Sequence, residues 1–244
     1  MSGPRYAIFF VPPAGGALYE FGAAALGYDS YSGLYSSDDV PTCNDAPTAE
    51  EWRQLTAEPR RYGFHATLKA PFRLRSEISE RDLIAELARL AACQAPPDRV
   101  VATIALLDGF AALVPSAPAP ALDLLAGSCV RAFDKFRDQM TAAERNRRRA
   151  HPLTPRQIDH LDCWGYPYVF EDFRFHMTLT GRLPVDRAAQ AVAFLRGLHK
   201  RWSVPAEILV DSIGLLRQDG PDLPFRVIAS APLHFQAAAQ ASGR

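Results

Sequence analysis

The sequence contains one short pattern twice, as Phe64-His65-Ala66-Thr67-Leu68 and as Phe175-His176-Met177-Thr178-Leu179. Each copy alternates apolar and polar residues, and the second histidine lies 111 residues after the first. Successive side chains of a β-strand point to opposite faces. The histidine and the threonine of each copy therefore share one face of a predicted strand. Two matched strands of this kind predict a pair of imidazoles with a hydroxyl beside each.

This set of groups suits cleavage of a phosphodiester by proton transfer. One group must take a proton from the attacking oxygen, and another must give one to the leaving oxygen. Histidine can do both, because its unperturbed pKa near 6.5 leaves both protonation states available close to neutral pH. The pattern thus predicts His65 and His176 as catalytic residues, and Thr67 and Thr178 as donors to phosphate oxygens. A single such motif is usually ordinary alternation on a half-exposed strand, whereas two copies favour a function.

Two cations lie in phase with the motifs. Lys69 follows Thr67 at the next position on the same predicted face, and Arg174 precedes His176 in the same way. A cation beside the phosphate would stabilise negative charge on its oxygens. Both residues are therefore candidates for substrate binding.

Each motif opens a predicted strand–helix–hairpin unit, at about residues 60–116 and 171–232. The first unit has a predicted helix after Ser79 and a hairpin of strands 100–107 and 110–114. In the second, we expect Asp186 to cap the helix and strands 208–216 and 225–229 to form the hairpin. An Asp-Gly turn follows the histidine by 43 residues in both units. A helical insertion at about residues 117–165, with a first helix over residues 122–140, is predicted between them.

Composition limits the classes of function. Basic and acidic residues balance at 27 each, so no net charge attracts nucleic acid or an anionic membrane. No apolar run approaches the roughly 20 residues of a membrane span, and residues 6–11 are too short for a secretory signal. Four separated cysteines without a C-x-x-C pair favour a cytoplasmic protein with free thiols. They are Cys43, Cys93, Cys129 and Cys163.

The two motifs resemble the signature motifs of the two-histidine (2H) phosphoesterase superfamily: histidine, any residue, threonine or serine, then an apolar residue. The wider context resembles the branch found with bacterial phosphonate-utilisation genes, and the resemblance covers nearly the whole chain. Its residues are Arg60-Arg61-Tyr62-Gly63-Phe64-His65-Ala66-Thr67-Leu68-Lys69-Ala70-Pro71-Phe72 and Arg5-Tyr6-Ala7-Ile8-Phe9-Phe10.

This resemblance implies a bilobal α+β fold with pseudo-twofold symmetry, in which two antiparallel sheets form a central cleft and helices pack outside. Residues 1–244 would then be a single bilobal domain and a monomer. It also implies metal-independent cleavage of a cyclic phosphate without a cofactor, with His65 and His176 as the acid–base pair. The association with phosphonate genes suggests a small phosphorylated substrate, a ribose cyclic phosphate.

Two other functions stay open. One is a phosphodiesterase acting on RNA ends or 2′,3′-cyclic nucleotides, and the other is a protein that binds a phosphorylated metabolite without turnover. The basic run at residues 145–149 can grip RNA phosphates or the distal phosphate of a small substrate. With no net charge overall, a solvated helix end is the favoured interpretation.

Further polar and aromatic residues have weaker implications. His160 and Cys163 have the spacing of metal ligands, but no second pair accompanies them, so we expect no metal. Gly15-Gly16 lacks the Lys-Ser/Thr of a phosphate-binding P-loop. Four tyrosines can either line a cleft and stack on a base or sugar, or simply pack in the core. They are Tyr6, Tyr62, Tyr166 and Tyr168.

Overall fold

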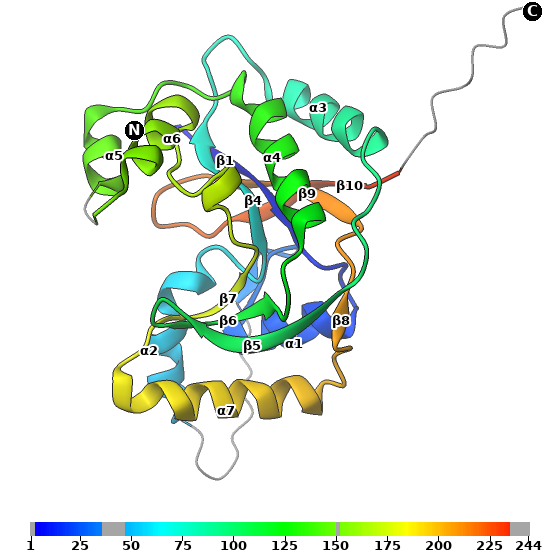
Figure 1. Cartoon of the computed structure of the whole chain (residues 1–244), viewed down its shortest axis with the longest axis vertical. Coiled ribbons are helices and arrows are strands. Elements are labelled where there is room, and N and C mark those ends of the chain that lie inside the picture. The colour runs from blue at the N-terminus through cyan, green and yellow to red at the C-terminus, as the bar shows by residue number, and fades with distance from the viewer. Residues whose placement is uncertain (1–2, 36–46, 150–151, 235–244) are drawn as a thin grey trace, which may run out of the picture.

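The computed structural model describes residues 3–35, 47–149 and 152–234 and shows a mixed α+β fold (Figure 1). Its strands are β1 (Arg5–Phe10), β2 (Tyr28–Asp29), β3 (Leu34–Tyr35), β4 (Ala66–Arg73), β5 (Val100–Leu107), β6 (Phe110–Pro115), β7 (Met177–Arg182), β8 (Glu207–Ile208), β9 (Ser212–Gln218) and β10 (Arg226–Pro232). Its helices are α1 (Ala17–Leu26), α2 (Ala49–Arg60), α3 (Glu80–Ala92), α4 (Pro120–Asp134), α5 (Ala142–Arg148), α6 (Pro155–Trp164), the short 3₁₀ helix η1 (Phe170–Asp172) and α7 (Val185–Arg201).

Eight of these strands form one curled antiparallel sheet in the order β10-β9-β1-β4-β7-β6-β5-β8. The expectation of two separate sheets is therefore corrected. The two four-stranded halves are joined at the centre, where β4 pairs with β7 through Ala66 and Met177. This join forms because the two motif strands begin side by side and run in opposite directions.

Each half of the sheet combines elements from both predicted units. The hairpin β5–β6 of the first unit lies beside β7 of the second. The hairpin β9–β10 of the second unit lies beside β1, which pairs with β4 of the first. The helices follow the same exchange, since α3 packs on β9 and β10 while α7 packs on β5 and β6 (Figure 1).

The predicted order of elements is present in both units, but some boundaries differ. The helix α7 begins after Pro184 rather than after Asp186, and α4 ends at Asp134 rather than near residue 140. The predicted strand 208–216 is divided into β8 and β9, which lie in different halves of the sheet. The chain crosses between them in residues 209–211, and so short a link can span at most about 14 Å. The sheet must therefore curl until its two ends approach each other.

The alternation of each motif matches its burial. Phe64, Ala66 and Leu68 are almost fully buried in the main core, whereas His65 and Thr67 are half-buried. The second motif behaves in the same way. Apolar burial on one face therefore holds the polar side chains toward the other.

Candidate functional site

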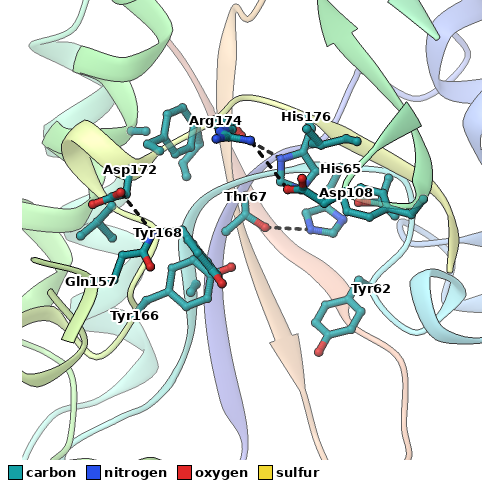
Figure 2. Close-up of a pocket in the computed structure, with 18 of the residues that line it drawn as sticks. Tyr62, His65, Thr67, Asp108, Gln157, Tyr166, Tyr168, Asp172, Arg174 and His176 are labelled. Carbon is teal, nitrogen blue, oxygen red and sulfur yellow. Dashed lines mark hydrogen bonds and ion pairs between the residues drawn. The ribbon is translucent and has the colours of Figure 1, made fainter. Parts of the chain in front are cut away.

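The four motif residues line one cavity of about 890 Å³ (Figure 2). His65 and His176 each lie one residue before a strand, β4 and β7 respectively. Because Ala66 pairs with Met177 in antiparallel register, each histidine lies opposite the threonine of the other motif. The structure thus brings His65, Thr67, His176 and Thr178 together, as the alternation predicts.

Both imidazoles are oriented by the same backbone contact. His65 Nδ1 lies 2.8 Å from the carbonyl oxygen of Gly63, and His176 Nδ1 lies 2.8 Å from that of Arg174. A carbonyl only accepts, so in each ring Nδ1 must carry the proton that it donates. The Nε2 atoms are then the ones that can exchange protons with a substrate. His65 Nε2 lies 3.1 Å from Thr67 Oγ1, which donates to it in this tautomer.

A tight turn before β4 places the Gly63 carbonyl. Gly63 has φ +73°, and a Cβ there would lie only 3.0 Å from the Cβ of Ser30. A residue with a side chain would therefore be strained in conformation and crowded in space. The glycine of the first motif is thus part of what orients His65.

The surroundings of the two rings differ. His65 stacks on Phe9 with the ring centroids 3.8 Å apart, and burial lowers the pKa of His65 to about 4, with the nearby His176 acting in the same direction. Burial also lowers the pKa of His176, but the carboxylate of Asp108 opposes this effect. In the protein without substrate, the neutral form is therefore favoured more strongly for the His65 imidazole than for the His176 imidazole.

Asp108 is a further site residue, which the sequence pattern indicates only as part of a turn. It lies at the β5–β6 turn with φ +49° and lines the cavity beside His176. Its carboxylate lies 3.7 Å from Arg174 Nη1, and both side chains are largely exposed (Figure 2). Arg174 therefore stands at the cavity as expected, with its charge partly balanced by Asp108.

Lys69 does not line this cavity. Its ammonium group is buried against α4, where it donates to Asp134 Oδ1 at 3.1 Å and to the carbonyl of Val130 at 3.3 Å. The reason is an irregular register on β4: Phe9 of β1 pairs with Thr67, but its neighbour Ile8 pairs with Lys69. The extra residue on β4 breaks the alternation, so Lys69 leaves the face that Thr67 occupies.

Three of the four candidate tyrosines line the cavity, namely Tyr62, Tyr166 and Tyr168. Tyr6 is buried elsewhere, with its hydroxyl donating to Glu80 at 3.0 Å. Figure 2 shows Tyr62 and Tyr166 on opposite sides of the space next to Thr67. Stacking of a base or sugar on these rings stays a prediction.

The insertion contributes Arg156 and Gln157 to the lining of the cavity, where both contact Asp172. Asp172 forms an ion pair with Arg156 at 2.7 Å and accepts from Gln157 Nε2 at 3.2 Å (Figure 2). The ring of His160 lies within 3.5 Å of Asp172, while Cys163 is exposed. Within residues 3–35, 47–149 and 152–234, no group of three or more metal-ligating side chains is close enough together to hold an ion.

The basic run at residues 145–149 is divided by the structure. Arg145 forms an exposed ion pair with Asp162 at 2.6 Å, and Arg149 is exposed at the end of α5. Arg148 instead folds inward, with its guanidinium 5.3 Å from the ring centre of Tyr166. Arg145 and Arg149 therefore belong to a solvated helix end, whereas Arg148 of the same run contacts the site.

A fold of this kind, with paired histidines in one cavity, can be compared with known proteins. The chain belongs to the family described as "Protein of unknown function (DUF1045)", whose model matches residues 67–226. That range contains the second motif and begins two residues after His65. In the described part of the chain, none of the helices has the length and apolar character needed to cross a membrane.

Two curated relatives carry the name ribose 1,5-bisphosphate phosphokinase PhnN. The protein of Janthinobacterium sp. (strain Marseille) is 34% identical over 227 residues, which are 91% of this chain and 49% of the relative. The protein of Laribacter hongkongensis (strain HLHK9) is 36% identical over 179 residues, 73% of this chain and 40% of the relative. The chain therefore spans about half the length, or less, of these relatives.

Proposed function

We propose that this protein is a metal-independent phosphodiesterase of the two-histidine superfamily, with the bilobal fold of that superfamily, which opens a cyclic phosphate by acid–base catalysis. The observation that carries the proposal is the matched pair of imidazoles in one cavity. Each holds Nδ1 on a backbone carbonyl and keeps Nε2 for chemistry. A site that only bound phosphate would not need two rings fixed in this tautomer.

The surroundings of the rings favour His65 as the general base and His176 as the general acid. A base must be neutral, and burial against Phe9 favours the neutral form of His65. An acid must carry a proton, and the Asp108 carboxylate favours the protonated form of His176.

The reaction follows from these roles. His65 Nε2 takes a proton from a water molecule as the water oxygen bonds to phosphorus. The bond from phosphorus to one ring oxygen breaks, and His176 Nε2 gives its proton to that oxygen. The product is a phosphomonoester beside a free hydroxyl. Thr67 and Thr178 would donate to the non-bridging oxygens, where negative charge accumulates in the transition state.

The pH dependence of kcat/KM tests the protonation states of this pair. We expect a bell whose acidic limb lies near pH 4, where His65 loses its proton, and whose basic limb lies below pH 6.5, where His176 does. The bell reports the pair rather than either ring alone. The profile of kcat should move to higher pH, because the bound phosphate anion stabilises both imidazolium forms. A maximum of kcat/KM above pH 7 would contradict the assignment.

The names of the relatives denote a kinase that acts on a ribose phosphate, and we propose that this chain shares the ribose phosphate as substrate but not the kinase reaction. Ribose 1,5-bisphosphate is a sugar carrying two phosphates, and a ribose cyclic phosphate is chemically close to it. A role in phosphonate metabolism, which the resemblance implies, fits the same substrate class. This chain contains no G-x₄-G-K-[ST] phosphate loop. We therefore assign the named kinase activity to the part of those relatives that this chain does not cover.

The decisive experiment is an assay of a panel of cyclic phosphates in the presence of EDTA. We expect ring opening to survive exhaustive chelation. The two motif strands offer only two imidazoles, since neutral hydroxyls are not usual zinc ligands, whereas a typical catalytic zinc has three protein ligands. Loss of activity in EDTA and its return with zinc or manganese would refute the mechanism. Binding without turnover would favour the metabolite-binding alternative, and ATP-dependent phosphorylation of a ribose phosphate would favour a kinase.

A further inference from the structure

A second cavity, of about 870 Å³, adjoins the histidine cavity. The two cavities are neighbours because they share five wall residues: Glu58, Tyr62, Thr67, Ala70 and Tyr166. The second cavity carries an excess of positive charge, since five arginines and three carboxylates line it: Arg5, Arg61, Arg73, Arg147 and Arg148, with Glu58, Glu144 and Asp222. These arginines come from four separate segments of the chain, which explains why the sequence pattern did not group them.

Acidic side chains neutralise some of this charge. Arg73 forms an ion pair with Glu144, and Arg61 lies 3.6 Å from Asp222. Arg5, Arg147 and Arg148 differ, because none of them forms an ion pair with a carboxylate of the described residues, and of the three only Arg5 and Arg148 are fixed by hydrogen bonds. Their partners are neutral, so their positive charge remains available to a ligand.

The contacts of these two arginines hold them in place without satisfying their charge. Arg5 Nε donates to Gln218 Oε1 at 2.8 Å. Arg148 Nη2 donates to the carbonyl of Pro71 at 3.2 Å, and its guanidinium lies over the ring of Tyr166. Burial, together with the like charge of Arg5, lowers the pKa of Arg148, while Tyr166 and the Glu144 carboxylate act in the opposite direction. An anion bound between these two guanidinium groups would offset their repulsion in this partly desolvated space.

Phosphate is the anion that matches this arrangement. A guanidinium presents a planar fork of donors that fits two phosphate oxygens at once. Arg148 also lies where the two cavities meet. Its guanidinium lies over the ring of Tyr166, which lines both cavities. Tyr62 also lines both cavities, and it is close enough to influence the pKa of Arg148. A phosphate held there would lie on the same molecule as a group held between the histidines.

We propose that the arginine cavity binds a terminal phosphomonoester of the substrate whose cyclic phosphate lies between His65 and His176. This inference rests on the function proposed for the histidine cavity and narrows its substrate class to a sugar cyclic phosphate with a second phosphate. The terminal phosphate of a short oligonucleotide has the same chemistry. The kinetic test therefore compares both sources.

The kinetic test uses ribose cyclic phosphate with and without a 5-phosphate, and a dinucleotide cyclic phosphate with and without a 5′-phosphate. We expect wild-type protein to favour the 5-phosphorylated sugar, and Arg148→Gln to reduce that preference in kcat/KM by about 10–100-fold, the effect of removing one charge-assisted contact. Arg148→Lys should recover part of it, because it keeps the charge but loses the fork. Arg149→Gln, at the exposed residue directly after α5 and outside the cavity, is the matched control with wild-type preference.

A binding test separates this proposal from the proposed reaction. Ribose 5-phosphate should bind wild-type protein in calorimetry, and Arg148→Gln and Arg5→Gln should each weaken that binding by about 10-fold or more. If ribose 5-phosphate binds in this way but no cyclic phosphate is opened, the arginine site is supported and the proposed reaction is refuted. If cyclic phosphates are opened with no preference for the 5-phosphate, and ribose 5-phosphate does not bind, the arginine site is wrong while the reaction stands. A preference confined to the dinucleotide would also overturn the sugar substrate.

Discussion

Alanine in place of His65 or of His176 is expected to lower kcat for ring opening by about 10²–10⁴-fold, the usual contribution of a general acid or base. The double variant should be little slower than the slower single variant. The two rings act in one proton-transfer cycle, so once one ring is removed, removing the other lowers kcat only slightly further. Steady-state kinetics on a reactive cyclic phosphate measure this directly.

The matched control for this series is His234→Ala. His234 is exposed, and the contact seen there is made by its backbone nitrogen, which donates to the Ala91 carbonyl. We expect wild-type activity from it. Two losses that multiply fully in the double variant would show that His65 and His176 act independently, and the acid–base pairing would have to be abandoned.

The second large effect is expected at Gly22, in the middle of α1. A Cβ at this position would overlap the ring of Phe64, which is almost fully buried. Gly22→Ala should therefore destabilise the protein by about 1–3 kcal/mol or more, the typical effect of overpacking a core. Because Phe64 directly precedes His65, kcat should fall in the fraction that remains folded. Chemical denaturation and single-turnover kinetics measure the two effects separately.

Gly197→Ala is the control for this substitution. Gly197 also lies inside a helix, α7, but apart from its chain neighbours and the backbone of its own helix no atom lies within 4 Å of the position that its Cβ would occupy. Alanine there should stabilise the protein by about 0.5–1 kcal/mol through helix propensity alone. Equal stability changes at the two glycines would contradict the tight packing of Phe64 against α1.

The sequence predicted the parts of this structure that depend on alternation. A buried apolar face held each histidine and threonine on the opposite face, so the two pairs could point into one space, although we expected them on two sheets across a cleft rather than on neighbouring strands of one sheet. The pairing of Ala66 with Met177 confirms that these strands meet. The catalytic roles of the four side chains stay predictions that the assays above test.

The sequence could not predict features set by pairing between distant segments. The displacement of Lys69 depends on how β4 pairs with β1, which no local pattern encodes. The arginine cavity gathers Arg5 and Arg148 from opposite parts of the chain. Asp108 was visible as a turn residue, but its place beside His176 follows from the pairing of β6 with β7.

The exchange of hairpins between the two halves has a consequence for biosynthesis. Strand β1 pairs with β9, so residues 5–9 cannot form these hydrogen bonds until residues 214–218 have been synthesised. At a translation rate of about 5–20 residues per second, the first strand leaves the ribosome roughly 10–40 seconds before its partner. During that interval the edge of β1 that β9 will cover is open to pairing with other chains. Nascent chains of this protein should therefore depend on chaperones until their last hairpin emerges, and slow codons late in the message would prolong that exposure.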